Sequence, residues 1–471
     1  MMALSDGSEP KLAEPFEVVY IQERRFGAGE SGWIRINHLP WKVAAFGRKA
    51  HAATGTSDCD NLFALETAML ERMIHNPTDG SRQDRFERFR LIEWWDQSKL
   101  SAAKVLVVGA GALGNEIVKN LALLGVGNIL IADMDRVENS NLSRSVLYRE
   151  SDNGRYKADV AVEAAKSLYP SIRAHAFNGN VVHDLGMGAF RWADLVIGGL
   201  DNREARLAIN RHCHRVNRPW IDGAIEAIAG TARVFLPGDG PCYECTMSQT
   251  DWRLLQARRS CNLLTRSEME AGKTPTTPTI ASIIAGVQCQ EAVKLLHGLA
   301  SIAGSGWVFD GLSAGSYLVE YQRKEDCLSH ETLGQIYALD AGVDDLTVGE
   351  LASEARRLLP GVQLESCRDV LQSLDCPRCG TSEKLFVSLG KVRAEKAFCP
   401  QCPGVRREVK TFFRIGDDPE LLDRTLGQIG IPPLDIVLAR RGDEVFGLEM
   451  SGDRQRVLGP LAEETEALSW E

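Results

Sequence analysis

The 471-residue sequence has no apolar run near the roughly 20 residues that a membrane-spanning helix requires. It has no basic excess either, because 54 Lys and Arg face 64 Asp and Glu, a net charge of −10. This balance argues against nucleic-acid binding, which needs positive charge to neutralise phosphates. The N-terminus is unlike a secretory signal peptide, and the chain contains no repeats and no low-complexity tract. We therefore expect a cytoplasmic protein with neither a membrane nor a nucleic-acid partner.

The composition and the order of elements indicate three regions. Hydrophobic residues make up 44% of the chain, enough for a large core. Residues 1–80 form an N-terminal extension without a legible chemical motif. Residues 81–330 alternate apolar strands with helices, which predicts a Rossmann-like, doubly wound parallel sheet and the α/β class. Residues 331–471 are expected to form a C-terminal α+β unit that contains a zinc ribbon at 376–402.

Individual elements can be placed from apolar runs and helical spacing. The expected strands are 104–108, 128–132 and 194–198. The expected helices are one that follows the glycine run 109–114 and extends through Leu124, one that begins at Lys157, and those at 279–296 and 347–359. Residues 426–438 with 445–450 are expected to form strand and turn.

Three glycines separate the first expected strand from its helix. Gly109, Gly111 and Gly114 follow the strand, Ala112 lies among them, and a helix through Leu124 is expected after this run. Glycine permits a tight turn and lets the N–H groups of a helix N-terminus approach phosphate oxygens. Asp133, 19 residues after Gly114, ends the next strand, where a carboxylate accepts a ribose hydroxyl. Taken alone, this motif fits an NAD-dependent dehydrogenase best.

Further residues favour ATP over a dinucleotide. Arg144 ends a Ser-Asn-Leu-Ser-Arg run soon after Asp133, Lys157 opens the next helix, and Asp201 and Asn202 follow a later strand. A triphosphate that loses pyrophosphate needs more cations than a dinucleotide and an acid to hold Mg²⁺. Arg144 and Lys157 can supply the cations, and Asp201 can supply the metal ligand. Each residue alone would be a surface cation or a helix cap, but their order on one frame predicts an ATP site.

With these motifs, residues 85–330 resemble the ubiquitin-activating, E1-like superfamily, which includes the adenylyltransferases of molybdopterin and thiamine biosynthesis. The nucleotide contacts that the resemblance implies are Asp133 on the ribose, with Asp135 and Asn141 nearby, and Arg144, Lys157, Asp201 and Asn202 around the phosphates and Mg²⁺. Residues 85–89 look like the RYxRQ segment of the family, whose second Arg reaches the γ-phosphate in the partner subunit's site. The resemblance therefore implies a homodimer in which Arg88 acts in trans, with Phe89 in place of the family's Gln.

The reaction that the resemblance implies is adenylation of the C-terminal Gly carboxylate of a ubiquitin-like protein. The carboxylate attacks the α-phosphate in line and pyrophosphate leaves, so positioning and charge neutralisation carry the catalysis. In enzymes similar to this stretch, a cysteine on a crossover loop then forms a thioester, and here that residue is Cys261. Two preceding arginines favour its thiolate. The alternative is a cysteine without a catalytic role, whereas Cys213 and Cys289 lie in helical patterns and are expected to be core thiols.

Twelve cysteines in a reducing compartment act as ligands, nucleophiles or core residues. Cys376, Cys379, Cys399 and Cys402 form two CxxC pairs separated by 19 residues, the spacing of a zinc ribbon. The segment between the pairs has too few apolar residues for a core of its own, so the metal would supply folding free energy. We expect a closed, structural zinc site.

A second metal site follows from the resemblance. Cys242 and Cys245 come after a turn-rich loop, and in the family this pair shares zinc with a second CxxC pair beyond the nucleotide domain. Here that stretch reads Cys327-Leu-Ser-His330, and three Cys with one His is an ordinary tetrahedral zinc set. The alternative is a decayed site in which His330 is not a ligand.

Together these features predict an enzyme that activates a ubiquitin-like protein with ATP and passes it to an E2-like conjugating enzyme. The chain is similar in this respect to the E1-like members of bacterial ubiquitin-like conjugation systems proposed in antiphage defence. One alternative is adenylation of a sulfur carrier for molybdopterin, thiamine or tRNA thiolation. The others are a nucleotide-binding scaffold without turnover and the dehydrogenase, which NAD binding would reveal.

Overall fold

The chain divides into two units, residues 1–82 and residues 83–471, and the second is compact. The computed structural model describes residues 84–463, except residues 239, 254–274, 389–391, 393 and 417. The N-terminal extension therefore lies outside the described residues and stays a prediction. Within the part that is described, every helix is too short or too polar to span a bilayer.

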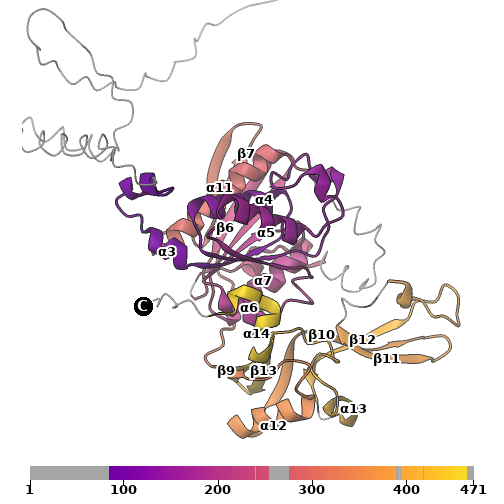
Figure 1. Ribbon diagram of the computed structural model, residues 1–471. Coiled ribbons are helices and arrows are strands. Elements are labelled where there is room, and N and C mark those ends of the chain that lie inside the picture. The colour runs from indigo at the N-terminus through magenta and orange to yellow at the C-terminus, as the bar shows by residue number, and fades with distance from the viewer. Residues whose placement is uncertain are drawn as a thin grey trace, which may run out of the picture. The chain divides into compact units, whose positions relative to one another are not determined.

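An eight-stranded sheet forms the larger half of the second unit (Figure 1). The strands are β1 (Lys104–Val108), β2 (Asn128–Ala132), β3 (Arg173–Phe177), β4 (Leu195–Gly199), β5 (Trp220–Glu226), β6 (Ala229–Phe235), β7 (Ser305–Asp310) and β8 (Gly315–Glu320). Their order is β3-β2-β1-β4-β5-β6-β7-β8; the first five run parallel and the last three pair antiparallel. The predicted α/β class with a Rossmann-like sheet is confirmed. Strand order reverses between β1 and β4, and open α/β sheets bind ligands beside such a point.

Helices cover both faces of the parallel strands. One face carries α4 (Ala112–Leu124), α5 (Lys157–Leu168) and α11 (Pro278–Leu296), and the other carries α6 (Met187–Trp192) and α7 (Arg203–Arg215). Strand β1 shows how the sequence specifies this arrangement. Val105 and Val107 join the core on one face, and Leu106 and Val108 join the core on the other. Because side chains alternate across a strand, an uninterrupted apolar run serves both layers.

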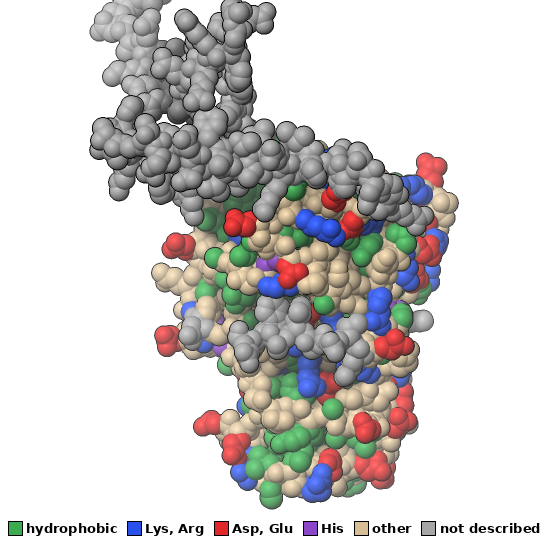
Figure 2. Space-filling view, turned by 60° about the vertical axis from the view of Figure 1, so that its left-hand side comes forward, with side chains coloured by type: hydrophobic (Ala, Val, Ile, Leu, Met, Phe, Trp, Pro, Cys, Tyr) green, Lys and Arg blue, Asp and Glu red, His purple; other side chains and the backbone are tan. Residues whose placement is uncertain are grey.

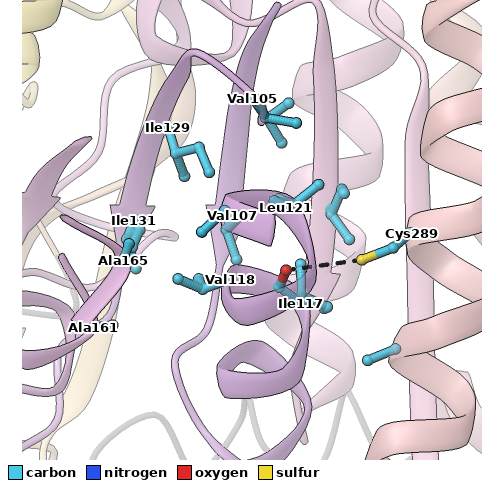
Figure 3. Close-up of a cluster of buried hydrophobic side chains, with 14 of the residues drawn as sticks. Val105, Val107, Ile117, Val118, Leu121, Ile129, Ile131, Ala161, Ala165 and Cys289 are labelled. Carbon is cyan, nitrogen blue, oxygen red and sulfur yellow. Dashed lines mark hydrogen bonds between the residues drawn. The ribbon is translucent and has the colours of Figure 1, made fainter. Parts of the chain in front are cut away.

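Figure 3 shows the first of these cores, where valines and isoleucines of β1 and β2 face α4. Cys289 of α11 reaches the same core, and its thiol donates to the carbonyl oxygen of Ile117 at 3.8 Å. Burial raises the pKa of Cys289 to about 12, so the group stays a neutral thiol. Cys213 of α7 is buried in the second core. Both predicted core thiols are confirmed.

The expected strands of this region and the helix expected at 279–296 agree with the structure to within one residue. The strand expected at 194–198 is β4, one residue later, because the Asp194 carboxylate accepts the Lys104 N–H at 2.8 Å and ends the preceding loop. The helix expected at 279–296 is α11, which starts at Pro278 with the Thr277 side chain as its N-cap. Proline suits this first helical position because its missing N–H would have no partner there.

A second, six-stranded sheet follows in the C-terminal part. Its strands are β9 (Ile336–Leu339), β10 (Gln363–Asp375), β11 (Ser382–Ser388), β12 (Glu408–Ile415), β13 (Ile436–Arg441) and β14 (Glu444–Met450), accompanied by α12 (Val348–Leu358), α13 (Pro419–Leu422) and α14 (Arg454–Leu458). The order is β11-β10-β13-β14-β9, and β12 also pairs with β10. Helix α12 lies where the sequence predicts a helix, and β13 occupies only the end of the expected 426–438 element. Strands β10 to β12 form an extended ribbon (Figure 1).

The two sheets share one core. Leu434 and Ile436 belong to the same apolar cluster as Phe190 of α6. The Gly188 N–H donates to the Leu434 carbonyl at 2.9 Å, so the backbones of the two regions touch. The expected domain boundary at residue 331 remains a prediction.

Candidate functional site

The turn between β1 and α4 carries the three predicted glycines. Gly109 has a φ of 94°, in the left-handed region that favours glycine. A Cβ on Gly114 would overlap the carbonyl oxygen of Gly109, so this position accepts no side chain. A Cβ on Gly111 would meet nothing within 4 Å, so the space at the helix N-terminus is open. From Ala112 onward α4 offers this space its free N–H groups and partial positive charge, which suits an anion.

Asp133 follows β2 and lies directly beside the turn. Its carboxylate accepts the N–H of Ala110 at 2.6 Å and the N–H of Asp135 at 2.7 Å. Desolvation by burial raises the pKa of Asp133, and the nearby Lys157 ammonium opposes that shift. Lys157 opens α5, and its Nζ pairs with Asp135 Oδ2 at 2.8 Å. The structure therefore gathers these predicted residues at the glycine turn.

Two buried polar residues that sequence reasoning missed hold the turn in place. The Asn115 amide donates to the carbonyls of Ala110 at 2.7 Å and Gly111 at 3.0 Å, and it accepts the Leu147 N–H at 2.9 Å. The Tyr148 hydroxyl donates to the same Ala110 carbonyl at 2.5 Å. The available sequence signal was an amide on the apolar face of α4. These contacts fix the chain after Arg144 against the turn.

Asn141 and Arg144 lie in a short turn that leads into this anchored segment. The Asn141 side chain accepts the Glu138 N–H at 3.0 Å, and Arg144 Nη1 donates to the Ser140 carbonyl at 2.7 Å. Arg144 is half-buried. Both predicted residues thus make local contacts that shape the turn.

The end of β4 packs against the glycine turn. A Cβ on Gly199 would lie 2.8 Å from the Gly114 amide nitrogen. Asp201 follows two residues later, and its side chain is exposed. The Asn202 side chain accepts the Ala205 N–H at 2.8 Å and caps α7. The predicted metal ligand Asp201 is therefore available at this edge, whereas Asn202 has a structural role as a helix cap.

Arg88 lies away from the glycine turn of the same chain. It belongs to the short helix η2 (Glu87–Leu91), and the preceding Phe86 packs against Gly125 at the C-terminal end of α4. The 13 residues of α4 span roughly 20 Å at 1.5 Å per residue, which separates this end from the turn. Arg88 is exposed. A role at an ATP site would require a second copy of the chain, and this role stays a prediction.

Cys261 lies outside the described residues, and its predicted role is untested. The chain on either side of it is anchored. Asp251 pairs with Arg203, the first residue of α7, at 2.8 Å. On the other side, the Ala227 N–H donates to the Pro275 carbonyl at 2.7 Å beside the β5–β6 turn. Both anchors lie at the edge where β4 and β5 end, the same edge as the glycine turn.

Cys242, Cys245, Cys327 and His330 converge, with all four ligand atoms within 4.8 Å of one another. Cys242 Sγ lies 3.7 Å from Cys245 Sγ and 3.6 Å from Cys327 Sγ, and Cys245 Sγ lies 3.3 Å from His330 Nε2. Tetrahedral zinc with Zn–S bonds of about 2.3 Å places its sulfurs about 3.8 Å apart. The set fits zinc, and His330 is close enough to be a ligand.

Cys376, Cys379, Cys399 and Cys402 form the second such group. The first pair lies between β10 and β11, the second lies between β11 and β12, and Cys379 Sγ is 3.7 Å from Cys399 Sγ. Three of the four are buried and Cys379 is exposed. Among the described residues, these two groups are the Cys, His and acidic sets that could hold a metal.

The fold and this edge define the class: an α/β protein with a Rossmann-like sheet, a glycine turn at a helix N-terminus that suits an anion, and two cysteine-rich groups that could hold metal. Residues 82–329 match the ThiF family, so the chain belongs to it, and the resemblance to E1-like adenylyltransferases is confirmed.

The chain is similar to proteins named as adenylyltransferases and activating enzymes. The chain is 33% identical over 237 residues to a sulfur carrier protein adenylyltransferase of Thermus thermophilus, covering 49% of this chain and 83% of that protein. It is 30% identical over 264 residues to the SAMP-activating enzyme E1 of Haloferax volcanii, and the match covers 53% of this chain and 89% of that enzyme. A SUMO-activating enzyme subunit of Caenorhabditis elegans shares 36% identity over 148 residues, only 25% of its length. The crystal structure of E. coli MccB with ATP gives a TM-score of 0.47 at 21% identity, covering 62% of this chain and 86% of MccB.

Proposed function

We propose that the chain is an adenylyltransferase that activates the C-terminal carboxylate of a ubiquitin-like carrier protein with ATP. The observation that carries the proposal is the arrangement of the open helix N-terminus at Gly111, Asp133, Lys157 and Asp201 at one sheet edge, in a chain of the ThiF family. A dehydrogenase or an inert scaffold would not require this set of cations and acids beside the glycine turn.

In the proposed reaction an oxygen of the carrier's C-terminal Gly forms a bond to the α-phosphorus, and the bond to pyrophosphate breaks. The N-terminus of α4 and Lys157 would neutralise charge on the phosphates, with Arg144 close by. Asp133 would accept a ribose hydroxyl in place of one of its backbone donors. Asp201 would hold the Mg²⁺ that accompanies ATP and stabilises the departing pyrophosphate.

We propose that Cys261 takes over the acyl group. Its thiolate would attack the acyl carbon, AMP would leave, and a thioester would remain for an E2-like partner. The anchors at Arg203 and Ala227 support this step, because both place the flanking chain at the edge that carries Asp201. On this basis the chain serves conjugation, with bacterial antiphage defence as the proposed setting. A homodimer in which Arg88 reaches the partner's site would complete the enzyme.

A second function is supported by the Thermus relative, which matches over 83% of its length and is named for a sulfur carrier. In that case the acyl-adenylate is the end product of this chain, and sulfur transfer to the carrier follows elsewhere. Cys261 would then have no catalytic role.

One experiment separates the two functions. Purified protein with candidate carriers that end in Gly is tested for exchange of radiolabelled pyrophosphate into ATP and for a carrier–enzyme band that thiol reductants remove. Conjugation predicts both, and Cys261→Ala should remove the band while exchange continues. Exchange without any such band supports the sulfur-carrier function. No exchange with any carrier, in protein shown to bind ATP, would contradict both.

We further propose that both groups, the one of three cysteines with His330 and the one of four cysteines, bind structural zinc. Each set would supply four protein ligands, which would leave no coordination position for a substrate.

A further inference from the structure

A buried arginine lies directly behind the loop that presents Asp201. Arg206 belongs to α7 and is 7% exposed. Its Nη2 donates to the carbonyl of Leu200 at 2.5 Å and to the carbonyl of Gly223 at 2.9 Å, and its Nε donates to Asp222 Oδ1 at 2.8 Å. Leu200 is the residue immediately before Asp201. A single guanidinium thus ties the end of β4 to the neighbouring strand β5.

The partner of Arg206 is itself held from the other side. Asp222 is completely buried, and its second oxygen accepts two bonds from Arg233 of β6, the Nε bond at 3.0 Å. The Arg233 guanidinium lies 5.1 Å from the centre of the Tyr243 ring. Two guanidinium groups against one carboxylate leave a net positive charge in the interior behind the proposed phosphate site. Buried charges of this kind are rigid because each must keep its hydrogen bonds.

We propose that Arg206 is a positioning residue that holds the Leu200 carbonyl, and with it the Asp201 carboxylate, in the geometry that binds the metal of Mg·ATP. The inference rests on the proposed function, because it assumes that Asp201 is the metal ligand. Arg206 is buried behind the loop and acts only through Leu200.

A positioning role differs measurably from general support of the fold. Loss of fold stability lowers affinity for ATP with and without Mg²⁺ by the same factor. Displacement of Asp201 weakens only the part of the affinity that Mg²⁺ adds. The ratio of ATP affinity with Mg²⁺ to ATP affinity in EDTA therefore isolates the proposed effect.

The structure provides a matched control in Arg368 of β10. Its side chain is likewise buried, pairs with Asp435 at 2.7 Å, and donates to the carbonyls of Val182 at 3.0 Å and Leu185 at 3.2 Å. It makes the same three kinds of contact as Arg206 but on residues that do not adjoin Asp201. Arg368→Met reports the cost of removing a buried arginine as such.

The test measures binding of radiolabelled ATP to the full chain by equilibrium dialysis, with Mg²⁺ and with EDTA. Arg206→Met should lower the affinity ratio about tenfold, towards the value of Asp201→Asn, while affinity in EDTA changes less than twofold. Arg206→Lys keeps the positive charge but can form fewer hydrogen bonds, so it should lower the affinity ratio about threefold. Arg368→Met should leave the ratio unchanged.

A wild-type ratio in folded Arg206→Met, or an equal fall in Arg368→Met, would overturn the inference. If Arg206→Met does not fold, Arg206→Lys decides, and a wild-type ratio there overturns it. If Asp201→Asn itself keeps the wild-type ratio, the metal role in the proposed function is wrong and the inference fails with it. Failure of the positioning role and failure of the metal role are distinguishable, because only failure of the metal role leaves Asp201→Asn with the wild-type affinity ratio.

Discussion

Replacing Gly114 with alanine is expected to abolish ATP binding and to lower the free energy of unfolding by about 4 kcal/mol, the upper range for single substitutions. The new Cβ would overlap the backbone carbonyl of Gly109. Neither atom belongs to a flexible side chain, so α4 would have to move away from β1. Gly199 also packs on the amide of Gly114, and the loop of Asp201 would be displaced with it. Thermal denaturation and equilibrium dialysis of radiolabelled ATP measure the two effects.

Two other glycines are matched controls for this substitution. Gly286 lies on the exposed face of α11, and a Cβ there meets nothing within 4 Å. Gly286→Ala should stabilise the protein by up to about 1 kcal/mol, because alanine is the better helix former, and leave ATP binding unchanged. Gly111→Ala should cost less than about 1 kcal/mol as a changed N-cap, yet weaken ATP binding because its methyl group enters the open space. Wild-type ATP affinity in Gly114→Ala would rule out this turn as the phosphate site.

The sequence was most informative where the relevant residues are neighbours in the chain. The glycines at 109, 111 and 114 predict their turn because its steric requirements are local. The structure explains Gly109 by its positive φ and Gly114 by its close approach to Gly109, whereas the space beside Gly111 is open. Apolar runs predict the parallel strands because a strand buried on both faces has no polar alternation. The CxxC spacing of the second cysteine group likewise predicts convergence on one metal, whereas the pairing of Cys327 and His330 with a distant CxxC came only from the family resemblance.

The sequence was least informative where residues that contact each other are far apart in the chain. Arg206 and Asp222 lie on different elements, and nothing in a helix of mixed polarity distinguishes a buried arginine from a surface one. The role of Asn115 was equally hard to predict, because it depends on residues 147–148 packing against the glycine turn. The order of the second sheet and its shared core with α6 also depend on long-range packing. Asn202 differs from these residues: the sequence placed it in a nucleotide motif, and the structure shows that its side chain also caps a helix.

Replacing Cys399 with serine is expected to remove one of two zinc ions per chain and to unfold the ribbon of β10 to β12 around it. Among the described residues of this ribbon, the apolar cluster contains three buried members, Leu371, Leu374 and Ala397. Structural zinc contributes an apparent binding free energy of about 10–16 kcal/mol in zinc-finger peptides, far more than so small a core supplies. Elemental analysis should give a zinc content of about one, and limited trypsin digestion should cut the ribbon in the variant but not in the wild type.

The control for this prediction is Cys367, which lies on β10 of the same ribbon. It is half-buried and outside both metal groups, and its thiol donates to the Ile436 carbonyl at 3.4 Å, a bond that a serine hydroxyl can also make. Cys367→Ser should keep both zinc ions and resist trypsin. Because the first half of β10 pairs with β13 in the sheet that shares a core with α6, unfolding should stop short of the nucleotide edge. Pyrophosphate exchange should therefore persist in Cys399→Ser. If exchange is lost while the rest of the chain stays folded, the ribbon acts in adenylation itself and zinc there is more than structural.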